Sequence, residues 1–344
     1  MEYVALGKTK LLASRTSFGA LPIQRVKDST EALTIIRKAY ESGINFFDTA
    51  RTYSDSESKI SSALCDVRND IIIATKSASK NKNDILEDLH TSLKTLRTDY
   101  IDIYQLHNPH FVPKPNDGSE IYETLKQAQQ QGKIRCIGIT SHSRILALDA
   151  ALSGLYDTVQ YPFSLLSSPE EIDLAKMCNQ LNVGFIAMKP LCGGLLTNIP
   201  LAFGFIRQYE NIIPIWGIQK QTELEQLLSL EAQPPIINAD FNAAVEAEQQ
   251  EFSINFCRSC GYCQPCPANI PIENANRMSL LLKRSPKEIW LTPEWNEKMN
   301  RIENCTKCGE CANRCPYHLK PFETLKTHLA DFRAQYEEFN ATHK

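Results

Sequence analysis

Short apolar runs alternate with amphipathic stretches along the first two thirds of the chain. The runs are rich in Ile, Val and Phe and predict buried strands, whereas the stretches repeat apolar residues every three or four positions and predict helices. The predicted strands are residues 16–18, 44–47, 71–75, 101–106, 134–139, 158–160, 183–188 and 212–216. The predicted helices are residues 30–42, 57–64, 85–96, 121–131, 144–152, 169–181 and 222–228, with a poorly defined segment at 201–208.

This alternation predicts the fold class. A hairpin is expected first, over residues 3–6 and 11–14, and Thr30 is expected to cap the first helix. Eight strand-helix units then follow within about 215 residues, which favours an α/β protein with a closed (β/α)8 TIM barrel. An open doubly wound sheet is the alternative, but no glycine-rich dinucleotide fingerprint follows the first strand.

A change of composition predicts the domain organisation. Residues 1–230 form the predicted barrel, and residues 231–250, which begin near Pro234-Pro235, form a predicted linker with some helix. Residues 251–344 form a predicted small, mainly helical domain that ends in a charged helical tail over 322–339. A chain of 344 residues is long enough for one large core and a smaller unit.

Charge and hydropathy narrow the range of partners. The formal net charge is −3, so no electrostatic signature for nucleic acid or an anionic membrane is present. The N-terminal residues lack the pattern of a secretory signal, and no apolar run reaches the roughly 18 residues of a transmembrane helix. We therefore expect a soluble, cytoplasmic protein.

Four polar residues stand at or just after the ends of three neighbouring predicted strands: Asp48 and Tyr53, Lys76, and His107. Each alone has an ordinary structural explanation, but strand ends of a parallel barrel meet in one pocket. A cation about 4 Å from a phenolate stabilises it by up to ~4 kcal/mol at an effective dielectric of 20, before desolvation opposes this effect, and Lys76 is the candidate for a cation that lowers the pKa of Tyr53. Asp48 would hold the ammonium, and His107 would orient a substrate carbonyl.

The motifs around these residues resemble the aldo-keto reductases. They are the segments 48–57, 74–76, 102–107 and 132–138, which recur in the family's order within residues 1–230. The resemblance implies a barrel that binds NADP(H) across its C-terminal face. It also implies that Asp48, Tyr53, Lys76 and His107 form a catalytic tetrad in which Tyr53 is the proton donor.

The resemblance also implies a set of cofactor contacts, although several positions depart from the family pattern. Thr140, Ser141 and Gln160 correspond to nicotinamide-binding positions, and Met188 stands where the family commonly has an aromatic ring. Gly217 and Lys220 are candidates for binding the adenosine phosphate, but Trp216 replaces a proline before this loop. A solvated loop lysine is the alternative for Lys220.

Twelve cysteines are present, and eight of them lie in two runs that each end in Cys-Pro. In two-cluster ferredoxins the cysteine before the proline serves the other cluster, so two 4Fe-4S clusters are predicted. One would be held by Cys257, Cys260, Cys263 and Cys315, and the other by Cys305, Cys308, Cys311 and Cys266. Zinc is the rival ligand, but it explains neither the third cysteine of each run nor the Cys-Pro ends.

A barrel followed by such a domain resembles the iron-sulfur subgroup of aldo-keto reductases. We expect an oxidoreductase that reduces a small carbonyl-type substrate, with NADPH, the clusters, or both as the electron source. Hydride transfer moves two electrons and each cluster moves one, so a ferredoxin-like or flavodoxin-like electron partner is a further expectation. The alternative is an electron-transfer or nucleotide-sensing protein whose barrel does not turn over.

Overall fold

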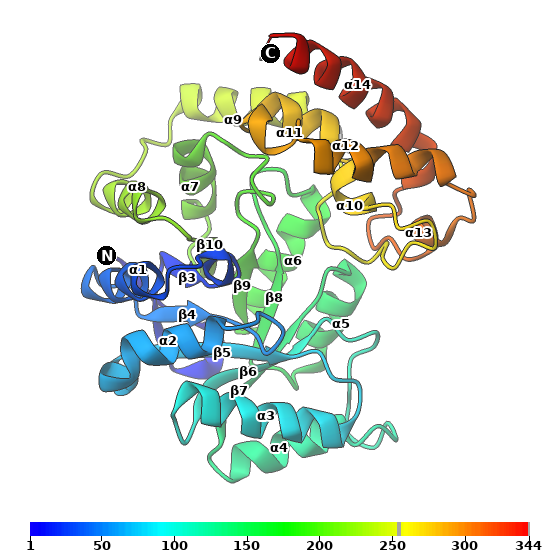
Figure 1. Ribbon diagram of the computed structural model, residues 1–344. Coiled ribbons are helices and arrows are strands. Elements are labelled where there is room, and N and C mark those ends of the chain that lie inside the picture. The colour runs from blue at the N-terminus through cyan, green and yellow to red at the C-terminus, as the bar shows by residue number, and fades with distance from the viewer. Residues whose placement is uncertain (253–255, 343–344) are drawn as a thin grey trace. The chain divides into compact units, whose positions relative to one another are not determined.

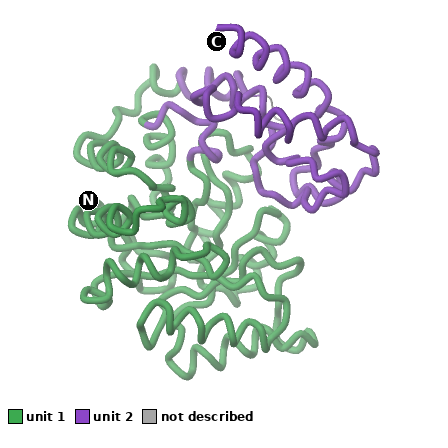
Figure 2. The backbone as a smooth tube through the Cα atoms, viewed as in Figure 1, with its two compact units in different colours: residues 1–190, 200–242 green, residues 191–199, 243–344 purple. Residues whose placement is uncertain are grey.

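The structure is a computed structural model that describes residues 1–252 and 256–342. The chain divides into two compact units, coloured separately in Figure 2. Unit 1 comprises Met1–Pro190 and Pro200–Asn242, and unit 2 comprises Leu191–Ile199 and Ala243–Lys344. The short segment Leu191–Ile199 therefore belongs by its packing to the second unit. The predicted domain limits at residues 230 and 250 stay predictions.

Unit 1 is built on a closed barrel of eight parallel strands in the order β10-β3-β4-β5-β6-β7-β8-β9, which confirms the predicted fold (Figure 1). The strands are β3 (Ser17–Gly19), β4 (Phe46–Asp48), β5 (Ile72–Ser77), β6 (Ile101–His107), β7 (Ile134–Thr140), β8 (Thr158–Pro162), β9 (Gly184–Met188) and β10 (Ile212–Gly217). The helices are α1 (Ser29–Glu41), α2 (Ser56–Leu64), α3 (Lys82–Leu96), α4 (Ile121–Gln130), α5 (Arg144–Ser153), α6 (Pro169–Gln180), α7 (Ile199–Arg207) and α8 (Gln221–Ala232).

The predicted hairpin, β1 (Tyr3–Ala5) and β2 (Leu12–Ser14), is antiparallel and covers the N-terminal end of the barrel. Leu6 follows β1 and packs in the interior cluster with Phe46 of β4 and Ile186 of β9. The Lys8 amide donates to the carbonyl of Asn182, just before β9. This end of the barrel is thus closed, and the C-terminal strand ends remain for chemistry.

Two local expectations need correction. Asp28, rather than Thr30, caps α1, because its carboxylate accepts the amides of Thr30 and Glu31. The poorly defined segment 201–208 lies mostly in the regular helix α7, whose residues from Leu201 to Ile206 are all buried. A helix that is apolar on every side shows no amphipathic period, which is why the pattern did not reveal it.

Unit 2 is helical. Its helices are α10 (Ile272–Ala275), α11 (Met278–Arg284), α12 (Pro293–Asn300), α13 (Glu310–Asn313) and α14 (Pro321–Thr342), and α9 (Ala239–Glu251) carries the chain into it. Met278, Met299 and Phe332 lie at the centre of its core and are fully buried. Cys263 and Cys311 belong to the same buried cluster. The cysteine runs are therefore tied to a hydrophobic core of their own.

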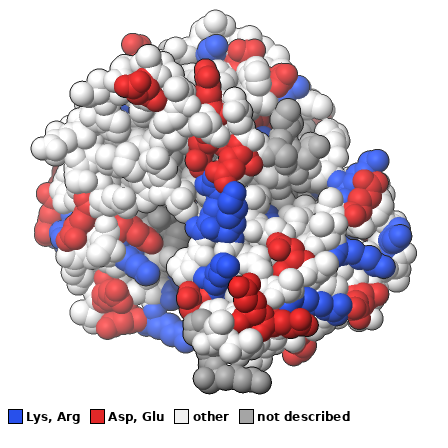
Figure 3. Space-filling view, turned by 90° about the horizontal axis from the view of Figure 1, so that it is seen from above, with Lys and Arg blue, Asp and Glu red and all other residues white. Residues whose placement is uncertain are grey.

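The surface carries charges of both signs. On the face shown in Figure 3, Lys and Arg side chains lie beside Asp and Glu side chains and do not form one broad basic area. Among the described residues, no helix combines the length and the apolar character needed to cross a bilayer.

Candidate active site and cysteine pockets

Three adjacent strands carry three of the predicted site residues at their C-terminal ends. Asp48 is the last residue of β4, Lys76 lies one residue before the end of β5, and His107 ends β6. Parallel pairing aligns Asp48 with Ala74 and Lys76 with Gln105. Tyr53 follows β4 in a turn closed by its own amide, which donates to the carbonyl of Ala50. The structure thus brings the four residues to one end of the barrel.

Lys76 and Asp48 form a buried ion pair. The Lys76 Nζ lies 2.6 Å from Asp48 Oδ1 and 2.6 Å from the carbonyl oxygen of Thr49. Both side chains are almost completely removed from solvent. Burial raises the pKa of Asp48 and lowers the pKa of Lys76, and the pairing opposes both shifts. The pair is held in place at the cost of desolvating two charges.

Gln105 completes this buried arrangement and was not predicted. Its Nε2 donates to Gln160 Oε1 at 3.0 Å and lies 3.4 Å from Asp48 Oδ2. It stands two positions before His107 on β6, so both side chains lie on the same face of the strand. A polar residue at this alternation in an apolar run was the signal available in the sequence. Gly138 makes room for it, because an added Cβ there would meet Gln105 Cγ at 2.9 Å.

The aromatic ring of Tyr53 lies between Lys76 and His107. Its centroid is 5.2 Å from Lys76 Nζ and 5.8 Å from the centroid of the His107 ring, which it meets edge-on. Burial, and then the charge of Asp48, raise the pKa of Tyr53. The expectation that Lys76 lowers this pKa is wrong for this structure. Because Asp48 neutralises the ammonium at 2.6 Å, burial dominates and the phenol remains protonated.

His107 is held as a neutral ring. Burial, and then the charge of Lys76, lower its pKa to about 3. Its Nδ1 is buried without a hydrogen-bond partner among the described residues. An unpaired lone pair is tolerated better than an unpaired buried N–H, so we assign the proton to Nε2. This nitrogen can then donate a hydrogen bond to a ligand.

We expect His107 to stay neutral down to pH values at which ordinary histidines are charged. Between about pH 6.5 and 3 the unfolded chain binds the proton and the folded chain does not, so this residue lowers folding stability as the pH falls. Hydrogen-deuterium exchange at the imidazole C2 position, followed by mass spectrometry against pH, measures the pKa directly. The same peptide in denatured protein is the control, and a folded-state midpoint near 6.5 would contradict the assignment.

The residues aligned with nicotinamide contacts lie around the same strand ends. Thr140 ends β7, and its Oγ1 accepts the amide of Asn108 at 3.0 Å. Ser141 comes next, and its hydroxyl is engaged with the backbone of Ser143. Gln160 of β8 is turned toward Gln105, as described above.

The departures from the family pattern have different structural settings. Met188 ends β9 and packs against the interior cluster of the barrel. Trp216 is fully buried and stacks on Phe203 of α7 with ring centroids 5.9 Å apart. Its ring therefore points into the layer between barrel and helices and contributes to the core.

The loop proposed to bind phosphate is already engaged within the chain. Glu223 of α8 accepts the amides of Gln219 at 2.8 Å and Lys220 at 3.1 Å. Backbone amides at a helix N-terminus are the groups that bind anions, and here a carboxylate occupies two of them. Gly217 and Lys220 are exposed to solvent beside it.

A pocket of about 160 Å³ opens beside His107. The loop after β6 lines one side with Asn108, Phe111 and Pro113, and residues 77–80 after β5 line the other. The lining combines apolar side chains, such as that of Ile121, with polar ones, among them Lys80 and His110. The pocket offers space for a small organic molecule next to the imidazole.

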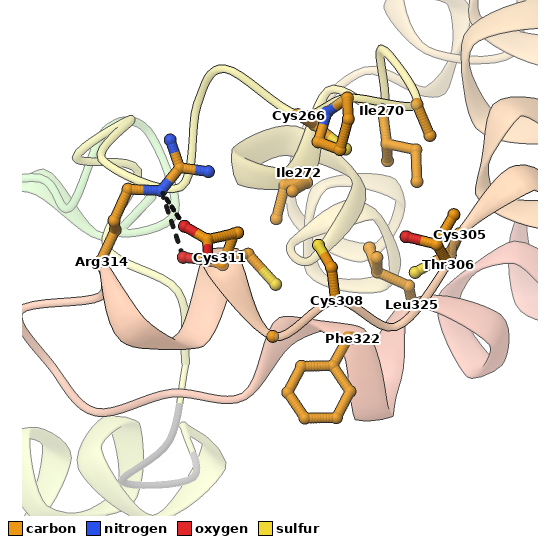
Figure 4. A pocket seen from close by; sticks show the side chains of 14 residues that line it. Cys266, Ile270, Ile272, Cys305, Thr306, Cys308, Cys311, Arg314, Phe322 and Leu325 are labelled. Carbon is orange, nitrogen blue, oxygen red and sulfur yellow. Dashed lines mark hydrogen bonds and ion pairs between the residues drawn. The ribbon is translucent and has the colours of Figure 1, made fainter.

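The cysteine runs form two pockets in unit 2. Cys257, Cys260, Cys263 and Cys315 line one. Cys266, Cys305, Cys308 and Cys311 line the other, where Figure 4 shows their sulfurs directed toward a shared space. Each pocket therefore collects three cysteines of one run and the Cys-Pro cysteine of the other. In the described parts of the chain, no three Cys, His, Asp or Glu side chains converge closely enough to hold a single ion.

Comparison with known proteins finds a family match in each of the two units. Residues 17–201 match the Aldo/keto reductase family, and residues 256–319 match a 4Fe-4S dicluster domain. Aldo-keto reductase YhdN from Bacillus subtilis is 33% identical over 218 residues, which cover 57% of this chain and 64% of that protein. L-galactose dehydrogenase from Arabidopsis thaliana is 32% identical over 215 residues, which cover 57% of this chain and 67% of that protein. The chain thus spans about two thirds of these relatives.

Solved structures share the barrel. Aldo-keto reductase AKR11C1 from Bacillus halodurans, in its holo form, superposes with a TM-score of 0.63 at 22% identity and covers 72% of this chain and 96% of its own. An aldo-keto reductase from Klebsiella pneumoniae in complex with NADPH gives a TM-score of 0.63 at 19% identity, with 72% and 95% coverage. Together with the family match, the barrel and its strand-end residues show that this chain belongs to the aldo/keto reductase family of oxidoreductases and carries a 4Fe-4S dicluster domain at its C-terminus.

Proposed function

We propose that the barrel reduces a small carbonyl-type substrate, with Tyr53 as the proton donor and NADPH as the hydride donor. The observation that carries this proposal is the convergence of the tetrad. A protonated phenol lies within 6 Å, by ring-centroid distances, of both a buried ammonium and a neutral imidazole. No hydrogen bond within the described residues engages the Tyr53 hydroxyl, so it is available to a ligand.

Each residue has a distinct part in the proposed reaction. His107 donates a hydrogen bond from Nε2 to the carbonyl oxygen and orients it, and the proton of Tyr53 passes to the same oxygen as negative charge develops there. The phenolate that remains lies beside the Lys76–Asp48 ion pair until solvent returns a proton. NADPH, when bound, would provide the hydride for the carbonyl carbon, so that carbonyl, NADPH and one proton would give alcohol and NADP⁺.

The residues around the tetrad favour binding of the nicotinamide and of the substrate, whereas the phosphate loop does so only if it rearranges. Thr140, Ser141 and Gln160 supply polar groups beside the tetrad, and the pocket lined by Phe111 and Pro113 suits an apolar substrate group next to His107. Gly217 and Lys220 would hold the adenosine phosphate only if Glu223 yields the two amides that it binds.

Anaerobic turnover tests this function. Protein reconstituted with iron and sulfide is mixed with NADPH and a panel of aliphatic and aromatic aldehydes and ketones. We expect NADPH loss matched by alcohol formation for some members of the panel, and no loss without a carbonyl. NADPH that binds but is not consumed with any substrate would instead favour a nucleotide-sensing barrel.

We further propose that the two cysteine pockets hold two 4Fe-4S clusters that exchange single electrons with a ferredoxin-like or flavodoxin-like partner. The support is the crossed ligand pattern, in which each Cys-Pro cysteine lines the pocket of the other run. Such an exchange of the fourth ligand is characteristic of two-cluster ferredoxins. Four thiolates around a volume suit a cube better than a single zinc ion, which needs four sulfurs about 2.3 Å from one point.

Metal analysis should find about eight irons per chain and little zinc. Replacing Cys311, which lines only one pocket, by serine should lower the iron content to about four and leave one cluster signal in the reduced protein. Cys178→Ser removes a buried thiol from the barrel helix α6 and is the matched control that should keep all the iron. Stoichiometric zinc in anaerobically purified protein would refute the cluster assignment.

Removal of the Glu223 charge should strengthen NADPH binding. Glu223→Gln frees the amides of Gln219 and Lys220 from a carboxylate that competes with phosphate and repels it. At this exposed loop the gain should be about 1 kcal/mol, roughly a fivefold lower Kd. Titration of protein fluorescence with NADPH measures it. Glu225→Gln, on the same helix but paired with Lys38, should leave Kd unchanged, and an equal effect of both variants would contradict the local explanation.

A further inference from the structure

Arg277 is a buried guanidinium in unit 2 that forms no ion pair with a carboxylate among the described residues. Only 3% of the residue is exposed, and it lies just before α11. Its Nη2 donates to the carbonyls of Cys192 and Gly193 at 3.2 and 3.1 Å. Its Nε is buried without a hydrogen-bond partner, and among the described residues it forms no ion pair. An isolated buried cation is costly, so its retention calls for a negative group nearby.

Arg284, the last residue of α11, is an arginine whose charge is paired with carboxylates. It also donates to a carbonyl of the segment Leu191–Ile199, that of Leu195 at 3.2 Å. Its guanidinium is paired with Glu248 at 2.6 Å and with Glu251. Both arginines thus anchor the same segment, but of these two only Arg284 has an ion-pair partner among the described residues.

One cysteine of the first pocket, Cys257, lies near this charge, and Glu273 lines the same pocket. Glu273 precedes Arg277 by four residues, and its carbonyl accepts from the Cys257 thiol at 3.7 Å. Burial lowers the pKa of Arg277, and among the groups that oppose this, the charge of Cys257 comes first, before those of Cys192 and Glu273. Cys257 is therefore the group whose ionised form gains most from the guanidinium.

We propose that Arg277 acts as a positioning charge that makes the cluster bound by Cys257, Cys260, Cys263 and Cys315 the more easily reduced of the two. The inference rests on the proposed two-cluster function. One electron from a reductant adds one negative charge to a cluster without making or breaking a bond, and a fixed cation in a low-dielectric interior favours that state. The other pocket also has an arginine in its lining, but Arg314 is partly exposed and lies 3.9 Å from the Glu310 carboxylate. Its cysteine Cys308 is exposed to solvent, which screens charge.

Potentiometric titration of the anaerobic protein, followed by EPR, tests this proposal. Arg277→Gln should lower the midpoint potential of the higher-potential cluster by at least 59 mV. For a one-electron step, this shift is a tenfold fall in the ratio of reduced to oxidised cluster at a fixed potential. Arg277→Lys keeps the charge and should restore most of the wild-type midpoint. Arg284→Gln is the matched control: it removes an anchor of the same segment without removing a charge near the cysteines, and should leave both midpoints in place.

A second measurement needs no change at Arg277. The higher-potential wave should disappear in Cys263→Ser and persist in Cys311→Ser. The opposite assignment overturns the proposal, as do unchanged midpoints in an Arg277→Gln protein that retains both clusters. Wild-type protein without iron-sulfur clusters would refute the proposed cluster function, a result distinct from either of these.

Discussion

The Tyr53→Phe protein is expected to reduce carbonyls 10²–10⁴-fold more slowly than the wild type in kcat/KM, because it loses positioned general acid catalysis. The loss of one oxygen atom leaves the packing against Lys76 and His107 intact. NADPH affinity and iron content should therefore remain close to those of the wild type. Steady-state rates with the best substrate of the panel, measured anaerobically, give the comparison.

A matched loss of a phenolic hydroxyl elsewhere in the barrel is the control. Tyr104 is buried in β6, and its hydroxyl donates to the carbonyl of Ile85 at 3.3 Å. Tyr104→Phe should therefore affect stability slightly and rate little. If Tyr53→Phe retained more than about a tenth of the wild-type kcat/KM, Tyr53 would not be the proton donor. A loss of less than about tenfold is smaller than the usual contribution of a general acid.

Loss of the Lys76 ammonium should destabilise the barrel strongly. Lys76→Met leaves the Asp48 carboxylate buried without its cation, and breaking a buried pair on one side typically costs about 3–5 kcal/mol of the free energy of unfolding. Denaturant unfolding followed by tryptophan fluorescence measures the loss. Because burial already raises the pKa of Asp48, protonation should relieve the cost, so the variant should regain stability as the pH falls.

The double variant Asp48→Asn with Lys76→Met separates the pair from its surroundings. It has no buried charge left at this place, and Gln105 can still donate to the new amide oxygen. We expect it to be more stable than Lys76→Met alone, which gives a favourable coupling free energy for the pair. Additive losses in the double-mutant cycle would mean that the two side chains contribute independently, against the geometry at 2.6 Å.

The order of strands and helices could be predicted because a parallel barrel buries both faces of each strand. Runs such as 71–74 and 183–188 are apolar without interruption, and the polar residues Asp48, Lys76 and His107 come at or near the ends of such runs. Strand-end reasoning therefore also located Asp48, Lys76 and His107, all of which the structure brings to one end of the barrel. Their catalytic roles stay predictions.

Other features depend on distances that no sequence pattern encodes. The pKa of Tyr53 follows from the balance between burial and an ammonium that Asp48 already neutralises, and this balance is visible only once the pair is in place. Glu223 was overlooked for a similar reason. A glutamate in the first turn of a helix is common, and only the fold shows that it holds the two amides expected to bind phosphate.

In the C-terminal region, the cysteine spacing predicted the two ligand sets, whereas no sequence pattern pointed to Arg277. The gaps of two or three residues between successive cysteines of each run allow the ligand sets to be predicted, because a cube needs thiolates in a narrow arrangement. Arg277 follows no motif, and it was recognised only because it is buried without an ion pair among the described residues.

The segment Leu191–Ile199 has a consequence for how this two-part chain could be divided or transplanted. It follows β9 in the sequence of the barrel, yet it is counted with the iron-sulfur unit, where Arg277 and Arg284 hold its carbonyls. A cut at residue 243 would therefore separate this inserted stretch from both arginines. The iron-sulfur unit therefore comprises more than the C-terminal region of the sequence. A successful chimera would have to exchange the loop after β9 together with the C-terminal region.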